Sequence, residues 1–343
     1  MHDITLKYFH AVAKTGSLSA ASDELHVAVS AISRQITQLE EQLQVSLFER
    51  KPRGMALTPA GDILYTYSLR SALELSNVVT EMKGLNSVQQ QTITLACPEG
   101  LAWDFVPYVT ALFHQQHPQV IFSLRVVDSG KASQLVKEGM ADAALTFSLQ
   151  PEQGLEVALQ VPSPVCALLS ARHPLALRNQ LSVHDLTGFP LAFSDSGTTL
   201  NYLFELACHI EGVKIVPAMT TNAMGAIYTY TKENPHAIAL CSDMAVKRRA
   251  QHDGLVLLPM REPSLTQRSI QLQVMSHRKQ PALVTQFIEF LTRMLQQQST
   301  AHGYSSISNG DDRHVTGRLQ PVGWCADKGH KLSNKSNNAL KNE

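Results

Sequence analysis

The sequence predicts an α/β fold preceded by a small all-α unit at the N-terminus. Two observations carry this prediction. In residues 9–43, apolar side chains recur at helical spacing on both sides of a short turn. Between residues 92 and 296, short apolar runs typical of strands alternate with helical segments, which indicates parallel α/β layers. A chain of 343 residues, 44% of them hydrophobic, is long enough for two or three domains.

The N-terminal unit is expected to contain two short helices joined by a tight turn at residues 26–28. Ser17 is a plausible N-cap for the first helix, Leu18–Leu25, and Ser30 could cap the second. Contacts to base edges and phosphates need short polar and basic side chains around the start of a second helix. The outward face of this one carries Ser33, Arg34, Thr37 and Gln38.

A segment similar to a wing follows at residues 50–59, with three cations in four residues: Arg50, Lys51 and Arg53. The formal net charge of the chain is zero, so the case for a nucleic-acid partner rests on where the charge lies and not on its total. Non-specific affinity for DNA should therefore be modest and sensitive to salt.

Residues 1–60 resemble the winged helix-turn-helix of LysR-type transcriptional regulators. The matches at fixed spacing are Phe9, Ala13, Gly16, Ser17, Ala20, Ala21, Leu25, Ser33, Arg34, Gln35, Ile36, Leu39, Glu40, Leu47, Phe48, Arg50, Leu57, Thr58, Ala60 and Gly61. The resemblance implies that the second helix lies in the major groove of double-stranded DNA and that the wing lies near the minor groove or the backbone. The DNA contacts that it implies are Ser30, Ser33, Arg34, Gln35, Gln38, Arg50, Lys51, Arg53 and Thr58.

Two positions depart from the family pattern. The family usually has Gln where this chain has Val29, and Gly where it has Gln44. The first departure leaves open which bases are read. The second should lower the stability of the helix end, because Gly tolerates a left-handed backbone better than Gln does.

A long helix is expected over residues 61–86, with a seam at spacings of three and four: Leu64, Ser68, Ser71, Leu75, Val78, Met82 and Leu85. One interpretation is an amphipathic helix packed on its own domain. The family resemblance favours a linker helix that pairs two chains antiparallel into a homodimer. Two such dimers joined through their effector domains would form a homotetramer.

Beyond a hinge at residues 87–91, strands and helices alternate. Strands are expected at residues 92–97, 121–127, 141–147, 165–170, 191–193, 215–219, 237–241 and 270–276, and helices at 103–117, 131–138, 200–211, 223–232 and 282–296. This part, residues 92–298, resembles the family's effector domain, which looks like a small type II periplasmic binding protein with two Rossmann-like α/β lobes. Lobe I is expected at residues 92–162 and 269–298, and lobe II at 163–268. The tail, residues 299–343, is polar and is expected to be disordered.

A two-lobed fold of this kind predicts a cleft for a small-molecule effector, such as a carboxylate or an amino acid. Its contacts should come from strand ends and helix starts, where free backbone N–H groups favour anions. The candidates are Cys97, Glu99, Gly100, Ser129, Thr146, Phe147, Ser194, Ser196, Thr198, Thr199, Thr221 and Asn222. For any one hydroxyl, simple N-capping is an equal alternative, and an inward Glu99 would oppose an anion. Family members often carry a hydroxyl residue near Gly100, which this chain does not.

Catalytic and metal-binding functions find little support. No GxSxG, HExxH or phosphate-binding Gly loop occurs, so no enzyme activity and no cofactor are expected. His114 and His117 are spaced like metal ligands but have no carboxylate or thiol beside them, which favours solvent exposure. The run 247–249, Lys-Arg-Arg, is expected on a solvated helix face. The five cysteines are scattered, so most should be buried and a redox pair is a minor alternative.

No apolar run is long enough for a membrane span and no signal pattern begins the chain, so a cytoplasmic protein is expected. Three rivals remain open. A solute-binding protein would use the two lobes alone. An enzyme with a fused DNA-binding domain would need a catalytic pair in the cleft. A DNA-binding protein with an empty or filled effector pocket would not respond to ligands.

Overall fold

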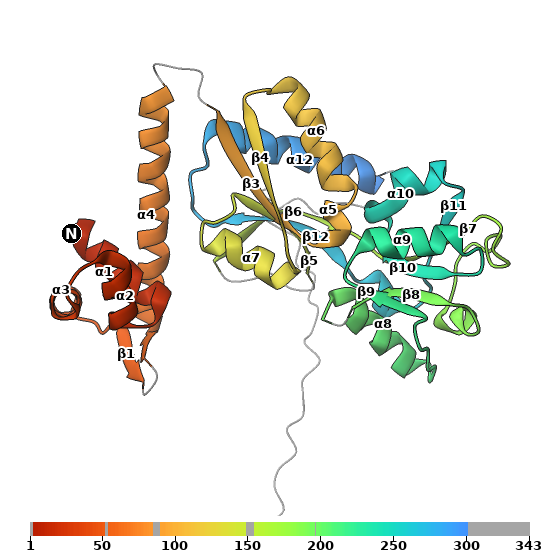
Figure 1. Ribbon diagram of the computed structural model, residues 1–343, viewed down its shortest axis with the longest axis horizontal. Coiled ribbons are helices and arrows are strands. Elements are labelled where there is room, and N and C mark those ends of the chain that lie inside the picture. The colour runs from red at the N-terminus through yellow and green to blue at the C-terminus, as the bar shows by residue number, and fades with distance from the viewer. Residues whose placement is uncertain (1–2, 52–53, 85–89, 149–153, 196, 301–343) are drawn as a thin grey trace, which may run out of the picture. The chain divides into compact units, whose positions relative to one another are not determined.

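The computed structural model describes residues 3–51, 54–84, 90–148, 154–195 and 197–300 (Figure 1). Predictions made for Arg53, for Ser196, for most of the hinge and for the tail beyond residue 300 lie outside the described residues.

The N-terminal unit consists of three helices and a two-stranded wing: α1 (Asp3–Thr15), α2 (Leu18–Leu25), α3 (Val29–Leu43), β1 (Phe48–Lys51) and β2 (Gly54–Leu57). Its core is built from the apolar faces of the three helices and from the start of the wing, and includes Phe9, Val12, Ala21, Ile32, Ile36, Leu39 and Leu47. The spacing of these residues is the helical period seen in the sequence, so the predicted helices are confirmed.

The two predicted caps have different outcomes. Ser17 caps α2 as predicted, because its hydroxyl accepts a hydrogen bond from the backbone N–H of Ala20 at 3.3 Å. The cap predicted at Ser30 is wrong. Helix α3 begins one residue earlier, at Val29, and its N-cap position is Ala28, which offers no side-chain hydrogen bond. Ser30 is therefore already inside the first turn and is exposed.

Helix α3 ends at Leu43, and the φ of 56° at its C-cap residue, Gln44, lies in the left-handed region. Such a backbone is strained for a residue with a Cβ, so Gln44→Gly is expected to stabilise the N-terminal unit by about 0.5–1 kcal/mol. The matched control is Gln42→Gly, which puts the same change inside the exposed helix and should destabilise by about 1 kcal/mol. Urea unfolding measures both. Equal effects of the two substitutions would contradict the strain at residue 44.

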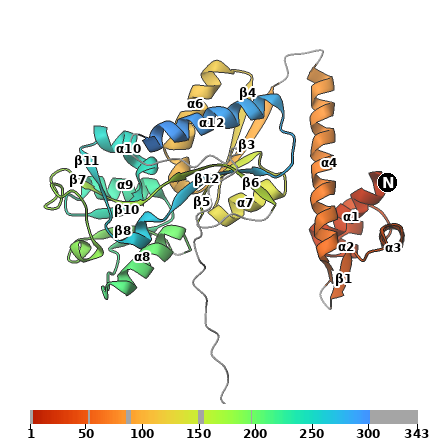
Figure 2. The same cartoon turned by 180° about the vertical axis from the view of Figure 1, so that it is seen from behind.

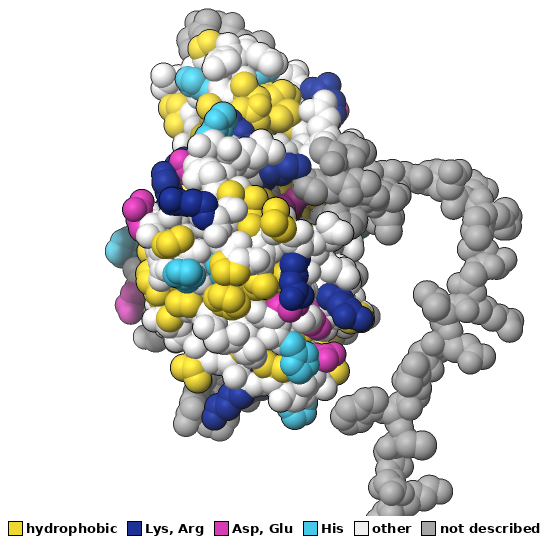
Figure 3. Space-filling view, turned by 90° about the vertical axis from the view of Figure 1, so that its right-hand side faces the viewer, with side chains coloured by type: hydrophobic (Ala, Val, Ile, Leu, Met, Phe, Trp, Pro, Cys, Tyr) yellow, Lys and Arg dark blue, Asp and Glu magenta, His cyan; other side chains and the backbone are white. Residues whose placement is uncertain are grey.

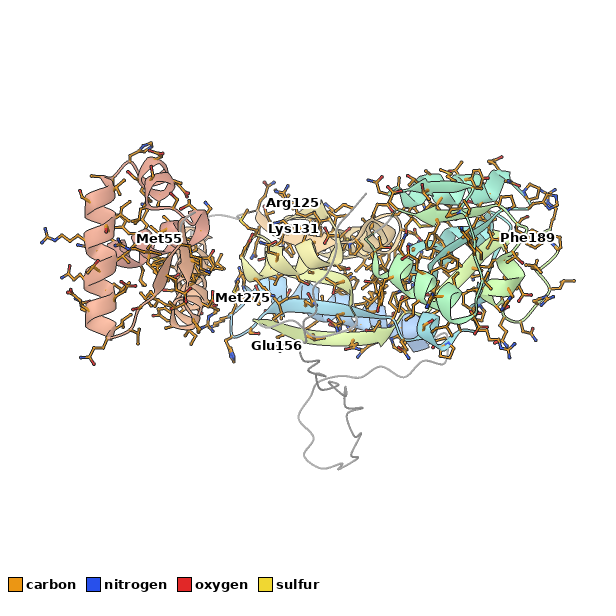
Figure 4. All side chains as sticks on the ribbon, turned by 90° about the horizontal axis from the view of Figure 1, so that it is seen from below. Met55, Arg125, Lys131, Glu156, Phe189 and Met275 are labelled. Carbon is orange, nitrogen blue, oxygen red and sulfur yellow. The ribbon has the colours of Figure 1, made fainter. Side chains whose placement is uncertain are left out.

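The wing is tied to the helices by backbone hydrogen bonds. β1 and β2 pair antiparallel, with Phe48 opposite Leu57. The N–H of Met55, which is labelled in Figure 4, donates to the carbonyl of Gly16 at 2.8 Å. The wing therefore has a fixed position beside the helices.

Helix α4 (Pro59–Gly84) confirms the predicted long helix. Its C-terminal half exposes several large apolar side chains at helical spacing: Leu75, Val78, Val79 and Met82. Water-exposed apolar residues in a stripe are unusual on a protein that has no partner.

Lobe I is a five-stranded sheet in the order β4–β3–β5–β12–β6. Its strands are β3 (Gln91–Cys97), β4 (Val120–Val126), β5 (Ala143–Ser148), β6 (Leu155–Pro162) and β12 (Ser269–Met275), and its helices are α5 (Glu99–Ala102), α6 (Phe105–Gln116), α7 (Ser129–Lys137) and α12 (Ala282–Thr300). Helices α6 and α12 cover one face and α7 the other (Figures 1 and 2).

Lobe II is a second five-stranded sheet, in the order β11–β7–β10–β8–β9. Its strands are β7 (Val165–Ser170), β8 (Leu191–Ser194), β9 (Met219–Thr221), β10 (Ile238–Ser242) and β11 (Leu255–Pro259), and its helices are η1 (Val183–Leu186), α8 (Thr199–Ile210), α9 (Met224–Glu233), α10 (Asp243–His252) and α11 (Pro263–Thr266). The chain crosses between the lobes twice, before β7 and before β12.

Both sheets are mixed, whereas the alternation of elements predicted parallel layers. Strand β3 is parallel to β4 and β5, and β8 is parallel to β9 and β10. The strands on either side of each crossing run antiparallel to their neighbours: β12 to β5 and β6, and β7 to β10 and β11. Strands β7 and β12 each enter a sheet from the other lobe. They are therefore not bound to the parallel direction that a strand–helix–strand unit within one lobe imposes.

The helix predicted at residues 103–117 is confirmed as α6, which begins at Phe105 and ends at Gln116. The four-residue helix α5 before it was not predicted. The strand predicted at 215–219 is wrong, because β9 begins only at Met219; the apolar run contains Pro217, and Val216 is 77% exposed. Strands β6 and β11 were not predicted as elements, and α10 was expected only as the helix that carries residues 247–249.

No helix in the described ranges is both long enough and apolar enough to cross a membrane.

Candidate DNA-binding surface and effector cleft

Helix α3 has one buried and one exposed face. Ile32, Ile36 and Leu39 are buried in the core of the N-terminal unit. The opposite face exposes Ser30, Arg34, Thr37 and Gln38. Among the described residues, no hydrogen bond or ion pair engages the Arg34 guanidinium, so its donors are available to a partner. On the face of lobe II seen in Figure 3, by contrast, Lys and Arg side chains are scattered and form no single patch.

The wing and α3 form one surface. Ser33, Thr37 and Arg50 line the same small cavity of about 40 Å³, between α3 and the strands. Lys51 is exposed and lies 3.7 Å from the carboxylate of Glu49, a loose ion pair that leaves most of its charge to solvent.

Two predicted contact residues have their polar groups engaged inside the unit. The Oε1 atom of Gln35, which is half-buried, accepts a hydrogen bond from the Thr5 hydroxyl at 3.0 Å. The Thr58 hydroxyl donates to the Ser46 carbonyl at 2.7 Å and accepts from the N–H of Gly61 at 3.0 Å. Thr58 thus caps the start of α4, a role that the sequence analysis did not give it.

Glu40 was missed as a positioning residue. Its Oε1 atom accepts the backbone N–H groups of Leu47 at 2.7 Å and of Phe48 at 3.2 Å. One carboxylate therefore holds the end of α3 against the beginning of the wing. Charge-assisted bonds to backbone N–H groups are among the stronger hydrogen bonds in proteins.

A cavity of about 600 Å³ lies where the two lobes meet. Most of the predicted effector residues border it: Glu99, Gly100, Ser129, Phe147, Ser194, Thr198, Thr199, Thr221 and Asn222. Cys97 and Thr146 do not border it. Both are buried, Cys97 within the core of lobe I, because alternate side chains of a strand point to opposite faces of the sheet.

The hydroxyls of the cleft mostly bond to the protein itself. Ser129 accepts the N–H of Phe147, and Thr199 donates to the carbonyl of the same residue, each at 3.0 Å. Thr198 accepts the N–H of Asn201 at 3.2 Å and so caps α8. For Thr198 the alternative of N-capping is therefore the one that the structure shows.

Glu99 spans the two lobes. It follows β3 in lobe I, and its Oε2 atom accepts the backbone N–H of Met224 in lobe II at 2.6 Å. Burial raises the pKa of this carboxyl group, while the hydrogen bonds from the N–H groups of Met224 and Gly225 oppose the rise. A carboxylate of the protein thus occupies the N-terminal end of α9.

Arg268 was missed by the sequence analysis, although it borders the same cavity. It is only 3% exposed, and its guanidinium lies 4.3 Å from the centroid of the Phe147 ring. Its Nε–H donates to the carbonyl of Ser163, at the first crossing between the lobes, at 3.1 Å. Burial lowers the pKa of Arg268 to about 10, so the group remains charged at neutral pH.

Behind the cleft, α10 packs on lobe I. Arg248 lies 3.3 Å from the centroid of the Tyr108 ring, and Arg249 lies 4.4 Å from that of Trp103. Arg249 also forms an ion pair with Asp104 at 3.5 Å. The run at 247–249 was predicted on a solvated face; these two arginines are exposed, but they also bridge the lobes.

His114 is exposed and His117 is half-buried against Phe113, with ring centroids 4.3 Å apart. Within the described part of the chain, no three His, Cys, Asp or Glu side chains are grouped to hold a metal ion. Burial raises the pKa of the Cys97 and Cys166 thiols to about 12, which makes both poor nucleophiles at neutral pH.

Comparison with known families agrees with this arrangement of a helix-turn-helix unit and a two-lobed domain. The model of the LysR substrate binding domain matches residues 86–296, more than half of the chain, and that of bacterial regulatory helix-turn-helix proteins of the lysR family matches residues 5–62. The chain belongs to the LysR family of transcriptional regulators.

Relatives of this LysR-family chain are themselves regulators. A probable nitrogen assimilation transcriptional activator from Synechococcus elongatus is 28% identical over 260 residues, which cover 75% of this chain and 84% of the relative. The transcriptional regulator BenM from Acinetobacter baylyi is 28% identical over 243 residues, 63% of this chain and 80% of BenM.

Solved structures share the fold. A full-length OxyR variant from Pseudomonas aeruginosa superposes with a TM-score of 0.57 at 16% identity, over 89% of this chain and 98% of that one. An OxyR variant from Corynebacterium glutamicum gives a TM-score of 0.51 at 18% identity, over 90% and 98%. The chain is thus a DNA-binding transcriptional regulator with an effector-binding domain, and its family is one of regulators and not of enzymes.

Proposed function

We propose that this LysR-family regulator reads duplex DNA with α3 and the wing, and that a small molecule in the cleft between the lobes changes its output. The observation that carries the proposal is the exposed polar face of α3, with an unengaged Arg34 and with Arg50 beside it on the wing. Short polar and basic side chains on a helix of this size suit base edges and phosphates in the major groove.

The proposed contacts divide into two groups. On α3, Arg34 and Gln35 are assigned to base edges, Ser30 and Ser33 to bases or phosphates, and Gln38 is a further contact from the exposed face. Contacts to phosphates or to the minor groove are assigned to Arg50, Lys51, Arg53 and Thr58. A contact from Gln35 or Thr58 would have to use the atoms that their internal hydrogen bonds leave free.

The proposed division of the chain is a DNA-binding domain at 1–60, a linker helix at 61–86, a hinge at 87–91, and an effector domain at 92–298 followed by the tail. We place the protein in the cytoplasm, where its DNA would be. A ligand in the cleft can act only through different affinities for two arrangements of the assembly.

The assembly is proposed to be a homodimer through α4, and a tetramer through the effector domains. Val78, in the middle of the exposed stripe of α4, is 50% exposed. Val78→Asp is expected to weaken the dimer by about tenfold or more, because it would bury an unpaired carboxylate. Sedimentation equilibrium of the full chain measures this. The control is Thr66→Asp, at an exposed position on the opposite side of the helix. Equal effects would remove the stripe from the interface.

A regulator whose cleft is closed by its own side chains is the second candidate. The Glu99 carboxylate at α9 and the engaged hydroxyls favour it. The effector, if one binds, is proposed to be a carboxylate or an amino acid.

The experiment that tests the proposal is a fluorescence-anisotropy titration of the full chain with duplex DNA from upstream of its own gene. Shuffled duplex is the control, and a panel of carboxylates and amino acids is added at fixed salt. A preference for the native duplex that one compound changes is the expected result. Equal affinity for both duplexes would reject specific recognition, and a preference that no compound changes would favour the closed cleft.

A further inference from the structure

Besides the four-residue α5, the N-terminal ends of four helices border the cavity between the lobes, and three of these four ends already carry a carboxylate of the protein itself. The carboxylates are Asp128 at α7, Glu99 at α9 and Asp243 at α10, and they accept backbone N–H groups there at 2.8, 2.6 and 2.8 Å. Helix N-termini favour negative charge. At these three ends that preference is satisfied within the chain.

The fourth end, that of α8, is different. Its N-cap is Thr198, a neutral hydroxyl, and the helix is twelve residues long (Thr199–Ile210). Asp195 lies three residues before the cap and also borders the cavity, but it is exposed, so water screens its charge. An anion in the cavity therefore finds one helix end without a carboxylate cap.

Arg268 supplies a second and independent feature. It is the one lysine or arginine that borders the cavity in the described part of the chain, and it is 97% buried. Its Nη2 atom has no hydrogen-bond partner among the described residues. Asp243 contributes a favourable charge nearby, but its Oδ1 atom already accepts the N–H of Met244. A buried charged donor without a partner is costly, so a ligand that accepts from it gains affinity.

Phe147 brings the two features to one place. Its carbonyl accepts the hydroxyl of Thr199 at the start of α8, and its ring lies under the guanidinium of Arg268. The start of α8 and Arg268 are thus neighbours of the same residue. An anion between them would meet the positive end of the helix and the unpartnered Nη2 of Arg268 together.

We propose that this corner, formed by Arg268 and the start of α8, holds a single carboxylate group of the effector, and that the rest of the effector is apolar. The inference deepens the proposed function and rests on its effector cleft. A second negative charge would face Glu99 or Asp128 at helix ends that are already satisfied. The apolar body would lie against Val126, Leu200 and Ile227, in a cavity of about 600 Å³.

The test uses thermal unfolding of the full chain with matched probes at constant pH and ionic strength. The probes are benzoate, 3-phenylpropionate and hexanoate, their three amides, and the dianions terephthalate and adipate. At least one monocarboxylate should raise the unfolding temperature, with an affinity about tenfold or more above that of its amide and of the dianions. This comparison needs no variant.

Three variants locate the charge. Arg268→Gln should lower the affinity for the stabilising carboxylate by about tenfold or more while leaving the affinity for its amide unchanged. Arg268→Lys keeps the charge but not the forked donors, so its affinity for the carboxylate should lie between those of the unaltered chain and Arg268→Gln. Arg261→Gln, at an exposed position before the crossing, should bind as the unaltered chain does.

Several results would overturn the inference. These are an amide or a dianion that binds at least as tightly as the monocarboxylate, no stabilisation by any monocarboxylate, and unchanged affinity in Arg268→Gln. If an amide binds and changes the affinity of the protein for duplex DNA, the effector cleft is supported and only the carboxylate assignment fails. DNA titration without any probe tests the DNA-binding part of the proposed function separately.

Discussion

Gly61→Ala is expected to unfold the N-terminal unit and to abolish specific DNA binding. A Cβ on Gly61 would lie 2.1 Å from the carbonyl oxygen of Leu47 and 2.9 Å from Cδ2 of Leu57. The carbonyl belongs to a backbone that cannot readily move, since the N–H of Leu47 is held by Glu40. Helix α4 and the wing would have to separate, at a cost of at least about 3 kcal/mol.

Hydrogen exchange followed by mass spectrometry on the full chain measures this effect. Amide protection should be lost in residues 3–57 and kept in β7 and β10 of lobe II, because the two parts have separate cores. Asp62→Ala, at the exposed neighbouring position, is the control and should retain protection throughout. Native protection of the wing in Gly61→Ala would show that the close approach of α4 to Leu47 is not essential.

Arg34→Ala is expected to weaken specific DNA binding by about 1–3 kcal/mol, or about 5- to 150-fold, if the guanidinium contacts a base as proposed. Arg34 is exposed and unengaged within the described residues, so the substitution removes no internal contact and should leave stability unchanged. The measurement is an anisotropy titration with native and shuffled duplexes.

The control is Lys14→Ala, which removes the same charge from the same unit. Lys14 lies on α1 and forms an ion pair with Glu24 at 2.9 Å, so its charge is already balanced on the surface. The Lys14→Ala substitution should therefore leave the affinity for the native and the shuffled duplex almost unchanged. Equal losses for Arg34→Ala on native and shuffled DNA would make Arg34 a phosphate contact, and no loss would move recognition elsewhere on α3.

The fold was predicted best where one segment decides its own structure. Periodicity and the matching cap predicted α2 and α4 closely, because an amphipathic helix carries its signal in consecutive residues. The same holds for β7, whose predicted bounds are those observed. Failures came where Pro217 interrupts an apolar run and at α5, whose four residues are too few to show a helical period.

The sequence predicted which residues border the cleft but not which hydrogen bonds they form. Strand ends and helix starts meet at the cavity because parallel strands end at one edge of a sheet, so residues such as Ser129 and Thr221 could be named in advance. Nothing local indicates that Glu99 will accept an N–H from Met224, 125 residues away. The role of Arg268 could not be predicted for the same reason, because its partners, Phe147 and Ser163, come from distant segments.

Glu40 illustrates a different limit. The sequence placed it on the second helix, in the matching pattern of the family, but gave no reason for a carboxylate there. The structure supplies one, since two backbone N–H groups at the beginning of the wing, those of Leu47 and Phe48, bond to the Glu40 carboxylate. The requirement that buried N–H groups find acceptors appears only once the chain is folded.

The most direct test of the central claim is a nuclease footprint of the full chain on DNA from upstream of its own gene. We predict a protected region at moderate salt. At a protein concentration at which the unaltered chain saturates the DNA site, the protection should persist with Lys14→Ala and fade with Arg34→Ala. Absence of protection at low salt, or a footprint unchanged by Arg34→Ala and Gly61→Ala alike, would contradict recognition through α3 and the wing.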